Sequence, residues 1–255
     1  MLQAIQAANE QCEADLIATC LAAHIFPKDY VGSISEYLAE ISTTLFPILK
    51  EENLSNRIDA FIEEEAFSPA LIAPYLQRAQ AMGFDITLHV DQFHAGSSAV
   101  AVKYKAISAD HLEASTEKEI QALATSEVIA VALPGASIGL GCAFTPARKL
   151  LDAGAALAIA SDWNPGSAPM GDLMTQAAIL GTFQKLSTTE VLSALTFRAA
   201  AALNLSDRGQ LQKGFLADFI SFPTNDYREI LYQQGQLKPG TVWKRGECVV
   251  HKIDS

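Results

Sequence analysis

The run Val128-Ile129-Ala130-Val131-Ala132-Leu133 contains no polar side chain, and Pro134-Gly135 follows it directly. A helix-like segment, residues 145–153, leads from there to a second short apolar run, residues 156–161. Short runs rich in Val, Ile, Leu and Ala are typical of strands that are buried on both faces of a parallel sheet. The stretch from residue 128 to residue 161 therefore predicts a strand–helix–strand unit.

The same alternation extends through most of the chain. Further strands are predicted at residues 15–22, 58–62, 86–89 and 106–109, and further helices at residues 34–50, 69–82, 115–124, 171–186 and 188–203. Strands that alternate with helices imply an α/β fold with a parallel sheet and right-handed crossovers, either a barrel or a doubly wound open sheet. No GxGxxG follows the first strand, so the dinucleotide-binding open sheet loses support.

The C-terminal part of the chain has a different pattern. Residues 209–222 are rich in turn residues and end in a predicted strand, and residues 241–250 are predicted to form a hairpin that turns near Arg245-Gly246. An isolated hairpin is marginally stable in water, so these pieces need a partner sheet. We expect two parts, residues 1–205 and residues 206–255.

Composition narrows the class of protein. The chain has 255 residues, with 18 Lys+Arg against 29 Asp+Glu and a net charge of −11. This acidic balance argues against nucleic acid or an anionic membrane as a partner, and the apolar runs are far below the roughly 18 residues that span a bilayer. Four cysteines without CxxC spacing, and no signal-peptide pattern, predict a cytoplasmic protein with reduced thiols. A small-molecule enzyme is favoured.

Candidate functional residues lie where the predicted strands end, because catalytic side chains gather at the carboxyl ends of parallel strands. The histidines and aspartates at these positions are His24, His89, Asp110, His111 and Asp162. Imidazole and carboxylate groups at one rim suit a divalent metal that generates hydroxide from water. We expect His89, His111 and Asp162 to converge at one rim of the sheet. His24 and Asn164 are expected at the edge of that site.

Three other features allow both a functional and a structural interpretation. Residues 63–65 are three consecutive glutamates after a strand, so one carboxylate could face the site, although a solvated acidic loop is an equal alternative. His94 follows a strand end at some distance and is interpreted as a loop residue. Cys142 has no base nearby in the sequence and is interpreted as a packed thiol.

Residues 162–167, Asp-Trp-Asn-Pro-Gly-Ser, carry the most information. A carboxylate at a strand end is followed there by the residues of a tight turn. Exposed amides and short polar side chains in such a turn suit a ligand carboxylate at a helix N-terminus.

With these motifs the sequence resembles the imidazolonepropionases, a family of the metal-dependent amidohydrolase superfamily. The matching stretches are residues 23–27, 59–63 with 66–68, 89–92, 108–113, 133–136, 161–167 and 226–229. The resemblance implies a (β/α)8 barrel with one zinc or iron ion. It also implies hydrolysis of the ring C–N bond of 4-imidazolone-5-propanoate to N-formimidoyl-L-glutamate, in histidine degradation.

The resemblance also implies roles for single residues. His89 and Asp162 are the implied metal ligands, Asp162 also takes the proton of the attacking water, and His111 polarises the ring carbonyl. The implied substrate contacts are His24 with the propanoate, Gln92 with the ring, and Asn164, Gly166 and Ser167 in support of substrate or product. Many relatives have Glu at the position of Gln92, so its part in proton transfer differs from theirs.

The sequence also departs from the family. The two further metal ligands of the family form a His-x-His pair, and no such pair exists in this sequence. A closed (β/α)8 barrel needs eight βα units where six are predicted. We therefore expect an incomplete TIM barrel, the last six βα units, with the C-terminal part of a small β-sandwich.

Several expectations follow from the incomplete barrel. The metal is expected to bind weakly or not at all, and the chain by itself to be inactive. The open sheet edges are expected to promote self-association, a homodimer included. Two alternatives remain open: another cyclic amidase or deaminase of the same superfamily, and a non-catalytic fragment.

Overall fold

The computed structural model describes residues 1–251 of the 255-residue chain. One sheet contains six parallel strands, each paired with the next in sequence: β1 (Cys20–Ala23), β2 (Arg57–Ile62), β3 (Asp85–Val90), β4 (Ser108–His111), β5 (Ile129–Ala132) and β6 (Leu157–Ile159). A doubly wound sheet reverses its strand order at a switch point. The strictly sequential order is instead that of a barrel wall, which decides between the two predicted arrangements.

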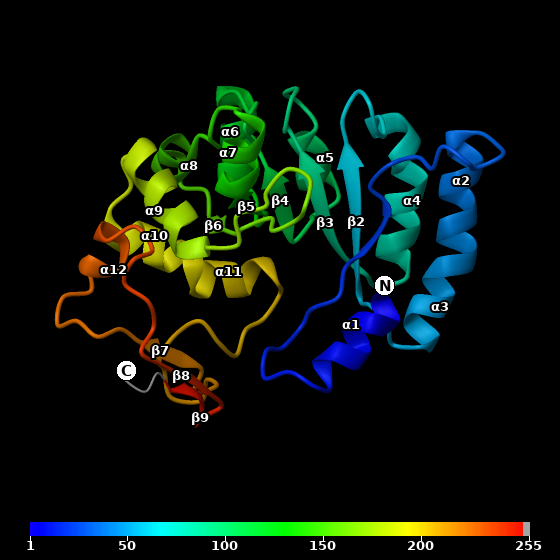
Figure 1. Ribbon diagram of the computed structural model, residues 1–255. Helices are drawn as coiled ribbons and strands as arrows, with labels where there is room; N and C mark the ends of the chain where they lie inside the picture. Colours follow the sequence, from blue (N-terminus) through cyan, green and yellow to red (C-terminus); the bar gives the residue numbers. More distant parts are fainter. Residues whose placement is uncertain (252–255) are drawn as a thin grey trace.

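Helices cover the outer face of this wall (Figure 1). The helices in the described part of the chain are α1 (Leu2–Asn9), α2 (Ile34–Glu40), the π-helical turn η1 (Ile41–Leu45), α3 (Phe46–Glu51), α4 (Pro69–Ala81), α5 (Ser98–Lys103), α6 (Glu117–Ala124), α7 (Pro134–Leu140), α8 (Ala147–Ala153), α9 (Leu173–Phe183), α10 (Thr188–Leu195), α11 (Phe197–Ala202) and α12 (Glu229–Tyr232). Helix α11 is the exception to the outer position, because it lies against the inner face of β5 and β6. Among the helices, α5, α7 and α12 were not predicted. Gly96-Ser97 precedes α5 and Pro134-Gly135 begins α7, and these residue types are typical of turns, whereas α12 is only four residues long. Within residues 1–251, none of the helices has the length and hydropathy of a membrane span.

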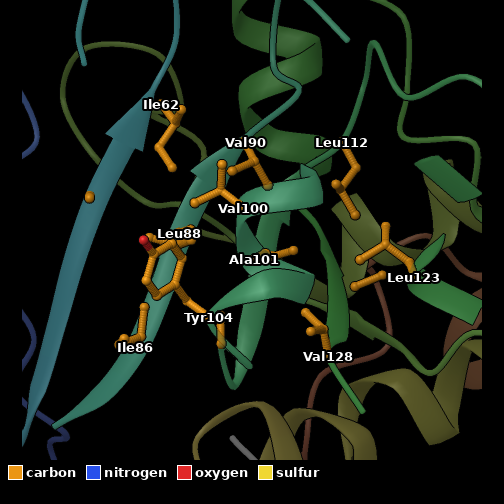
Figure 2. Close-up of a cluster of buried hydrophobic side chains, with 14 of the residues drawn as sticks. Ile62, Ile86, Leu88, Val90, Val100, Ala101, Tyr104, Leu112, Leu123 and Val128 are labelled. Atoms are coloured by element: carbon orange, nitrogen blue, oxygen red, sulfur yellow. The ribbon is translucent and has the colours of Figure 1, made fainter. Parts of the chain in front are cut away.

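The outer face of the sheet carries the main hydrophobic core. Ile86, Leu88 and Val90 of β3 lie beside Val100 of α5 and Tyr104, the residue that ends it (Figure 2). Alternate residues of a strand point to opposite faces, so these positions of β3 all reach the helices. The positions between them, Thr87 and His89, line the cavity on the inner face.

The inner face differs from the expectation of strands that are apolar on both sides. On β5 and β6, Val131 and Ala158 pack against Ala202 of α11 and form a small second core. On β2 to β4, the corresponding positions carry Asp59, His89 and polar neighbours that line a cavity of about 370 Å³. The expectation was therefore wrong for these three strands, where ionisable side chains alternate with the apolar ones.

The sheet curves around this cavity. Leu21 of β1 and Ala158 of β6 both line it, although their strands are the two edges of the sheet. Among the described residues, each of these edge strands has a partner on one side only. A curved, parallel, six-stranded α/β wall is thus observed, as a partial TIM barrel requires.

Two predicted elements have different bounds in the structure. The strand predicted at residues 15–22 is ordered as a strand only from Cys20, because the backbone before it binds side chains: Leu16 N–H donates to Asn9 Oδ1 (2.9 Å), and the Ser55 hydroxyl donates to the carbonyl oxygen of Ala18 (2.7 Å). The helix predicted at residues 188–203 breaks at Thr196, where φ is −118° and ψ is −101°. This break turns α11 under the inner face of β5 and β6.

A second, antiparallel sheet contains β7 (Phe219–Ser221), β8 (Thr241–Lys244) and β9 (Glu247–His251) and lies beyond α11, at the bottom of the view in Figure 1. Arg245 and Gly246 both have positive φ, 53° and 84°, as the turn of a tight hairpin requires. The predicted hairpin is confirmed. Only these three strands of the expected small sandwich are present in the described part of the chain.

Asp15 connects the N-terminal segment with this second sheet. Its carboxylate pairs with Arg208 and, at 2.6 Å, with the ammonium group of Lys244 on β8. The hydrogen bonds from Lys244 and Arg208 lower the pKa of Asp15 to about 2. This ion-pair cluster therefore attaches the N-terminal segment to the second sheet.

We expect Asp15→Asn to lower the free energy of unfolding at pH 7 by about 1 kcal/mol, the upper end for a partly exposed ion pair. Because the pKa is lowered from 3.8 to about 2 in the folded chain, the stabilisation is fully present above pH 4 and is lost as the pH falls toward 2. Urea unfolding at pH 7 and pH 3 measures both effects. The exposed Asp29→Asn serves as the control, and equal stability of Asp15→Asn and the parent chain at pH 7 would contradict this account.

The unpaired edges of β1 and β6 predict self-association, since an unpaired strand offers its backbone groups to another chain. Light scattering at tens of micromolar is expected to show species larger than the monomer. Leu21→Lys, which places a charge on the β1 edge, is expected to reduce association, whereas Val31→Lys, at a fully exposed site outside the strands, is not. A monomer at these concentrations would show that the edges are protected.

Candidate active site

A buried ion pair lies at the centre of the inner face. Asp59 of β2 is fully buried, and its Oδ1 lies 2.7 Å from Nδ1 of His89 on β3. Its other oxygen, Oδ2, lies 3.6 Å from Nδ1 of His24, which directly follows β1. Three consecutive strands therefore contribute to one cluster.

The charge of His89 is stabilised by the carboxylates around it. Burial opposes the imidazolium form, but Asp59, with smaller contributions from Asp110 and Asp162, outweighs it and raises the pKa of His89 to about 9. Burial likewise opposes the charge of Asp59, and His89 and His24 reverse this effect, so that the pKa of Asp59 is lowered. The pair is therefore ionised at neutral pH in the metal-free chain.

The same hydrogen bond determines which nitrogen of His89 can bind a metal. Nδ1 faces Asp59, so Nε2 is the nitrogen left for a ligand. A carboxylate that orients a ligating imidazole in this way is a recurrent feature of metal sites. A metal on Nε2 must displace the proton that the imidazolium carries there.

One group of side chains in the described region has the spacing of a metal site. The ligand atoms of His24, Asp59 and His89 all lie within 4.8 Å of one another. Asp59 Oδ2 has no hydrogen-bond partner there, whereas Oδ1 is occupied by His89. The residues thus fit a divalent cation either as this triad or with Asp59 orienting His89 and Asp162 as the second ligand.

Three imidazoles lie next to one another at the carboxyl ends of the strands. The ring centroid of His89 lies 4.9 Å from that of His24 and 5.2 Å from that of His111. His111 is almost completely buried, and His24 is half-exposed. The structure therefore brings together the three histidines that the sequence placed at strand ends.

Asp162 lines the same cavity as His89 and lies just beyond β6. Its backbone has a positive φ of 49°, which is unfavourable for a residue with a side chain. Asn164 fixes the loop in this conformation: its amide nitrogen donates to the Asp162 carbonyl oxygen (2.6 Å), and its Oδ1 accepts from the N–H groups of Gly166 and Ser167, both at 2.8 Å. These amides are thus already bonded within the loop, in contrast to the exposed amides that we expected.

Helix α7 supports the Asp162 loop through two glycines. A Cβ at Gly139 would lie 1.8 Å from the Ser167 carbonyl oxygen, and a Cβ at Gly135 would lie 2.5 Å from that of Ser161. Residues four positions apart share a helix face, so this face of α7 has no side chains where the loop backbone rests on it. The backbone of α7 therefore packs directly against the loop backbone and holds Asp162 in position.

The other rim loops are also held by buried carboxylates. Glu63 accepts hydrogen bonds from the N–H groups of Phe93 and His94 (2.8 and 3.1 Å) and from His94 Nδ1 (2.9 Å). Glu63 therefore fits neither interpretation given above, a carboxylate in the site or a solvated loop residue. It connects the loop after β2 to the loop after β3. Gln92 lies half-buried in that second loop, next to the fully buried Asp91.

Sequence patterns indicated no role for Asp59 and no inward position for Arg57. Arg57 begins β2 and Asp59 lies in its middle, so neither is at the carboxyl end, where catalytic residues are expected. A carboxylate between apolar residues, as in Ile58-Asp59-Ala60, was the available signal, because such a group is buried only with a partner. Arg57 donates to the carbonyl oxygen of Ala202, which ends α11 and closes the lower part of the cavity.

The family model for the amidohydrolase family matches residues 37–250. The chain thus belongs to the amidohydrolase family. Among its relatives is the imidazolonepropionase of Deinococcus deserti, which is 40% identical over 98% of this chain and 61% of its own length. The imidazolonepropionase of Deinococcus radiodurans is 41% identical over 96% of this chain and 61% of its own length. The chain therefore spans about three-fifths of these relatives.

Solved structures agree with this fold. The 5-methylcytosine deaminase from Klebsiella pneumoniae, liganded with 5-fluorocytosine, has a TM-score of 0.78 at 17% identity and covers all of this chain and 68% of its own. A zinc-bound adenosine deaminase from Xanthomonas campestris has a TM-score of 0.74 at 22% identity over 98% of this chain and 64% of its own. At these identities the likeness concerns the fold alone.

We expect Asp59→Asn to lower the pKa of His89 from about 9 toward its unperturbed 6.5 or below, because the leading favourable charge is removed while the burial remains. An NMR titration of the imidazole signals measures this in the metal-free chain. Glu64→Gln, which changes an exposed carboxylate near His94, is the matched control and should leave His89 unchanged. An unaltered His89 titration in Asp59→Asn would show that Asp59 does not cause the raised pKa.

Proposed function

We propose that this chain carries the reacting centre of an imidazolonepropionase, which hydrolyses the ring C–N bond of 4-imidazolone-5-propanoate to N-formimidoyl-L-glutamate. The observation that supports it most is His89, held through Nδ1 by Asp59 and lining one cavity with Asp162. The identity of 40–41% to imidazolonepropionases adds the substrate class. Because the chain spans about three-fifths of those relatives, the activity of the whole enzyme is part of the proposal.

We assign the residues as follows. His89 Nε2 and Asp162 would hold one zinc or iron ion, which when bound activates water and polarises a carbonyl. Asp162 takes the proton of the attacking water as the water adds to the ring carbonyl carbon. His111 stabilises the oxygen on which charge develops, and the ring C–N bond breaks as its nitrogen receives the proton that Asp162 took from the water.

The remaining residues bind and orient the substrate. His24, half-exposed beside His89, contacts the propanoate, and Gln92 contacts the ring. Asn164, Gly166 and Ser167 support substrate or product through the loop whose shape Asn164 fixes. We also propose the division into a barrel part, residues 1–205, and a C-terminal sandwich part, residues 206–255.

Metal content tests the ligand assignment. Two protein ligands fall short of the three usual in catalytic zinc sites, so zinc should be largely lost on dialysis of the chain. Stoichiometric zinc retained through dialysis, and lost in Asp59→Ala, would favour the triad of His24, Asp59 and His89 instead.

The activity is tested with a fusion protein in which the segment of the Deinococcus deserti relative outside the matched region is joined to this chain. The fusion protein is expected to consume 4-imidazolone-5-propanoate, followed by loss of its absorbance. Asp162→Asn should lower the rate on the order of 10²–10⁴-fold, the contribution of a general base, with any loss of metal added. Lys213→Ala, at an exposed site, is the control.

The outcomes separate the candidate functions. Normal turnover by Asp162→Asn would remove Asp162 from the mechanism. Another outcome is a folded fusion protein that leaves this substrate unchanged and hydrolyses another cyclic amide or deaminates a nucleobase. That result would favour a different amidohydrolase activity, which the fold of the two deaminases also allows.

A further inference from the structure

A further buried carboxylate, that of Glu113, lies beside His111. Glu113 follows β4 by two residues, and its side chain is only 4% exposed. Its Oε2 lies 3.5 Å from Nδ1 of His111, whose side chain is 3% exposed. Neither atom has a hydrogen-bond partner among the described residues. Two buried atoms that can donate and accept a proton thus face each other.

The carboxylate is itself fixed by a neighbouring strand-to-helix unit. The hydroxyl of Ser137 on α7 donates to Glu113 Oε1 at 3.0 Å, and Ser137 is also almost completely buried. This leaves Oε2 as the oxygen that faces the ring of His111. The row Ser137, Glu113, His111 has the arrangement of an acid that orients an imidazole, in which a third group holds the acid.

The backbone between these side chains is held in an unfavourable conformation. His111 and Leu112 both have positive φ, 83° and 69°, which costs about 1–2 kcal/mol for each residue with a side chain. The Thr145 hydroxyl binds the His111 carbonyl oxygen at 2.5 Å, and the side chain of Leu112 is fully buried in the outer core (Figure 2). Such strain persists only where the surroundings determine the geometry, and it clusters at functional sites.

We propose that Glu113 is a positioning residue that holds His111 with its proton on Nδ1, so that Nε2 is the nitrogen that meets the substrate. This rests on the role proposed above for His111. A hydrogen bond that serves catalysis is often long in a ligand-free enzyme and shortens in the complex, as the 3.5 Å separation allows. In the mechanism, a fixed tautomer presents the same ring nitrogen to the developing charge in every turnover.

The protonation state of the ring nitrogens tests the proposal directly in the metal-free chain. With ¹⁵N-labelled histidine, NMR distinguishes protonated from unprotonated ring nitrogens, and His111→Asn identifies the signals, since Asn tolerates positive φ. Nδ1 of His111 is expected to carry the proton. In Glu113→Gln, the amide oxygen accepts from Ser137 and the amide NH₂ then faces the ring, so the proton is expected to move to Nε2. Glu127→Gln, at an exposed site, is the control.

Two results would overturn the proposal: an unprotonated Nδ1 in the parent chain, or a proton that stays on Nδ1 in Glu113→Gln. If Glu113→Gln fails to fold, the parent spectrum still decides, and Ser137→Ala is expected to increase exchange between the two tautomers. In the active fusion protein, Glu113→Gln should lower kcat on the order of 10²–10⁴-fold with little change in KM. A parent fusion protein without turnover would instead count against the proposed function and leave the tautomer result standing.

Discussion

The ion pair between Asp59 and His89 is the interaction on which the rest of the site depends. A fully buried carboxylate is tolerated only when a partner compensates for the lost hydration, and removing that partner typically costs about 3–5 kcal/mol. Here the partner is an imidazolium on the neighbouring strand, at 2.7 Å. Because β2 and β3 pair in parallel register, the two side chains meet only if both strands present the same face to the interior. The pair thus links the shared inward face of β2 and β3 to the orientation of the candidate metal ligand.

Around this pair, buried polar side chains hold the loops that follow the strands in place. Asp91 accepts from Ser98 N–H and from the Ser97 and Ser115 hydroxyls, so it closes the loop that carries Gln92. Asn164 closes the loop of Asp162 in the same way. The side chains of Asp91 and Asn164 are bonded to protein donors instead of water, so the loops that carry Gln92 and Asp162 are preorganised before a substrate binds. The positive φ values of Asp91, His111 and Asp162 are the conformational cost of that arrangement.

The two faces of the six-stranded sheet carry different kinds of side chain. The outer face buries aliphatic side chains under the helices and supplies most of the hydrophobic stabilisation. The inner face has a small apolar core only where α11 covers β5 and β6, and elsewhere it holds ionisable groups around the cavity. Arg57, buried beneath the cavity, joins the two regions through the carbonyl oxygen of Ala202. Stability and chemistry are therefore separated by the alternation of residues along the same strands.

The sequence by itself determined the parallel α/β class, six strands, the C-terminal hairpin and the strand-end histidines, because these depend on local periodicity and turn residues. It did not determine the length of β1, the break at Thr196 or the helices α5 and α7. At β1 the reason is that side chains of Asn9 and Ser55 bind the backbone before Cys20. Nor did it reveal the partners of the site: Asp59 lies 30 residues from His89, and Glu63 lies 31 residues from His94. Only the pairing of neighbouring strands brings such groups within bonding distance, so tertiary structure decided which carboxylate orients which imidazole.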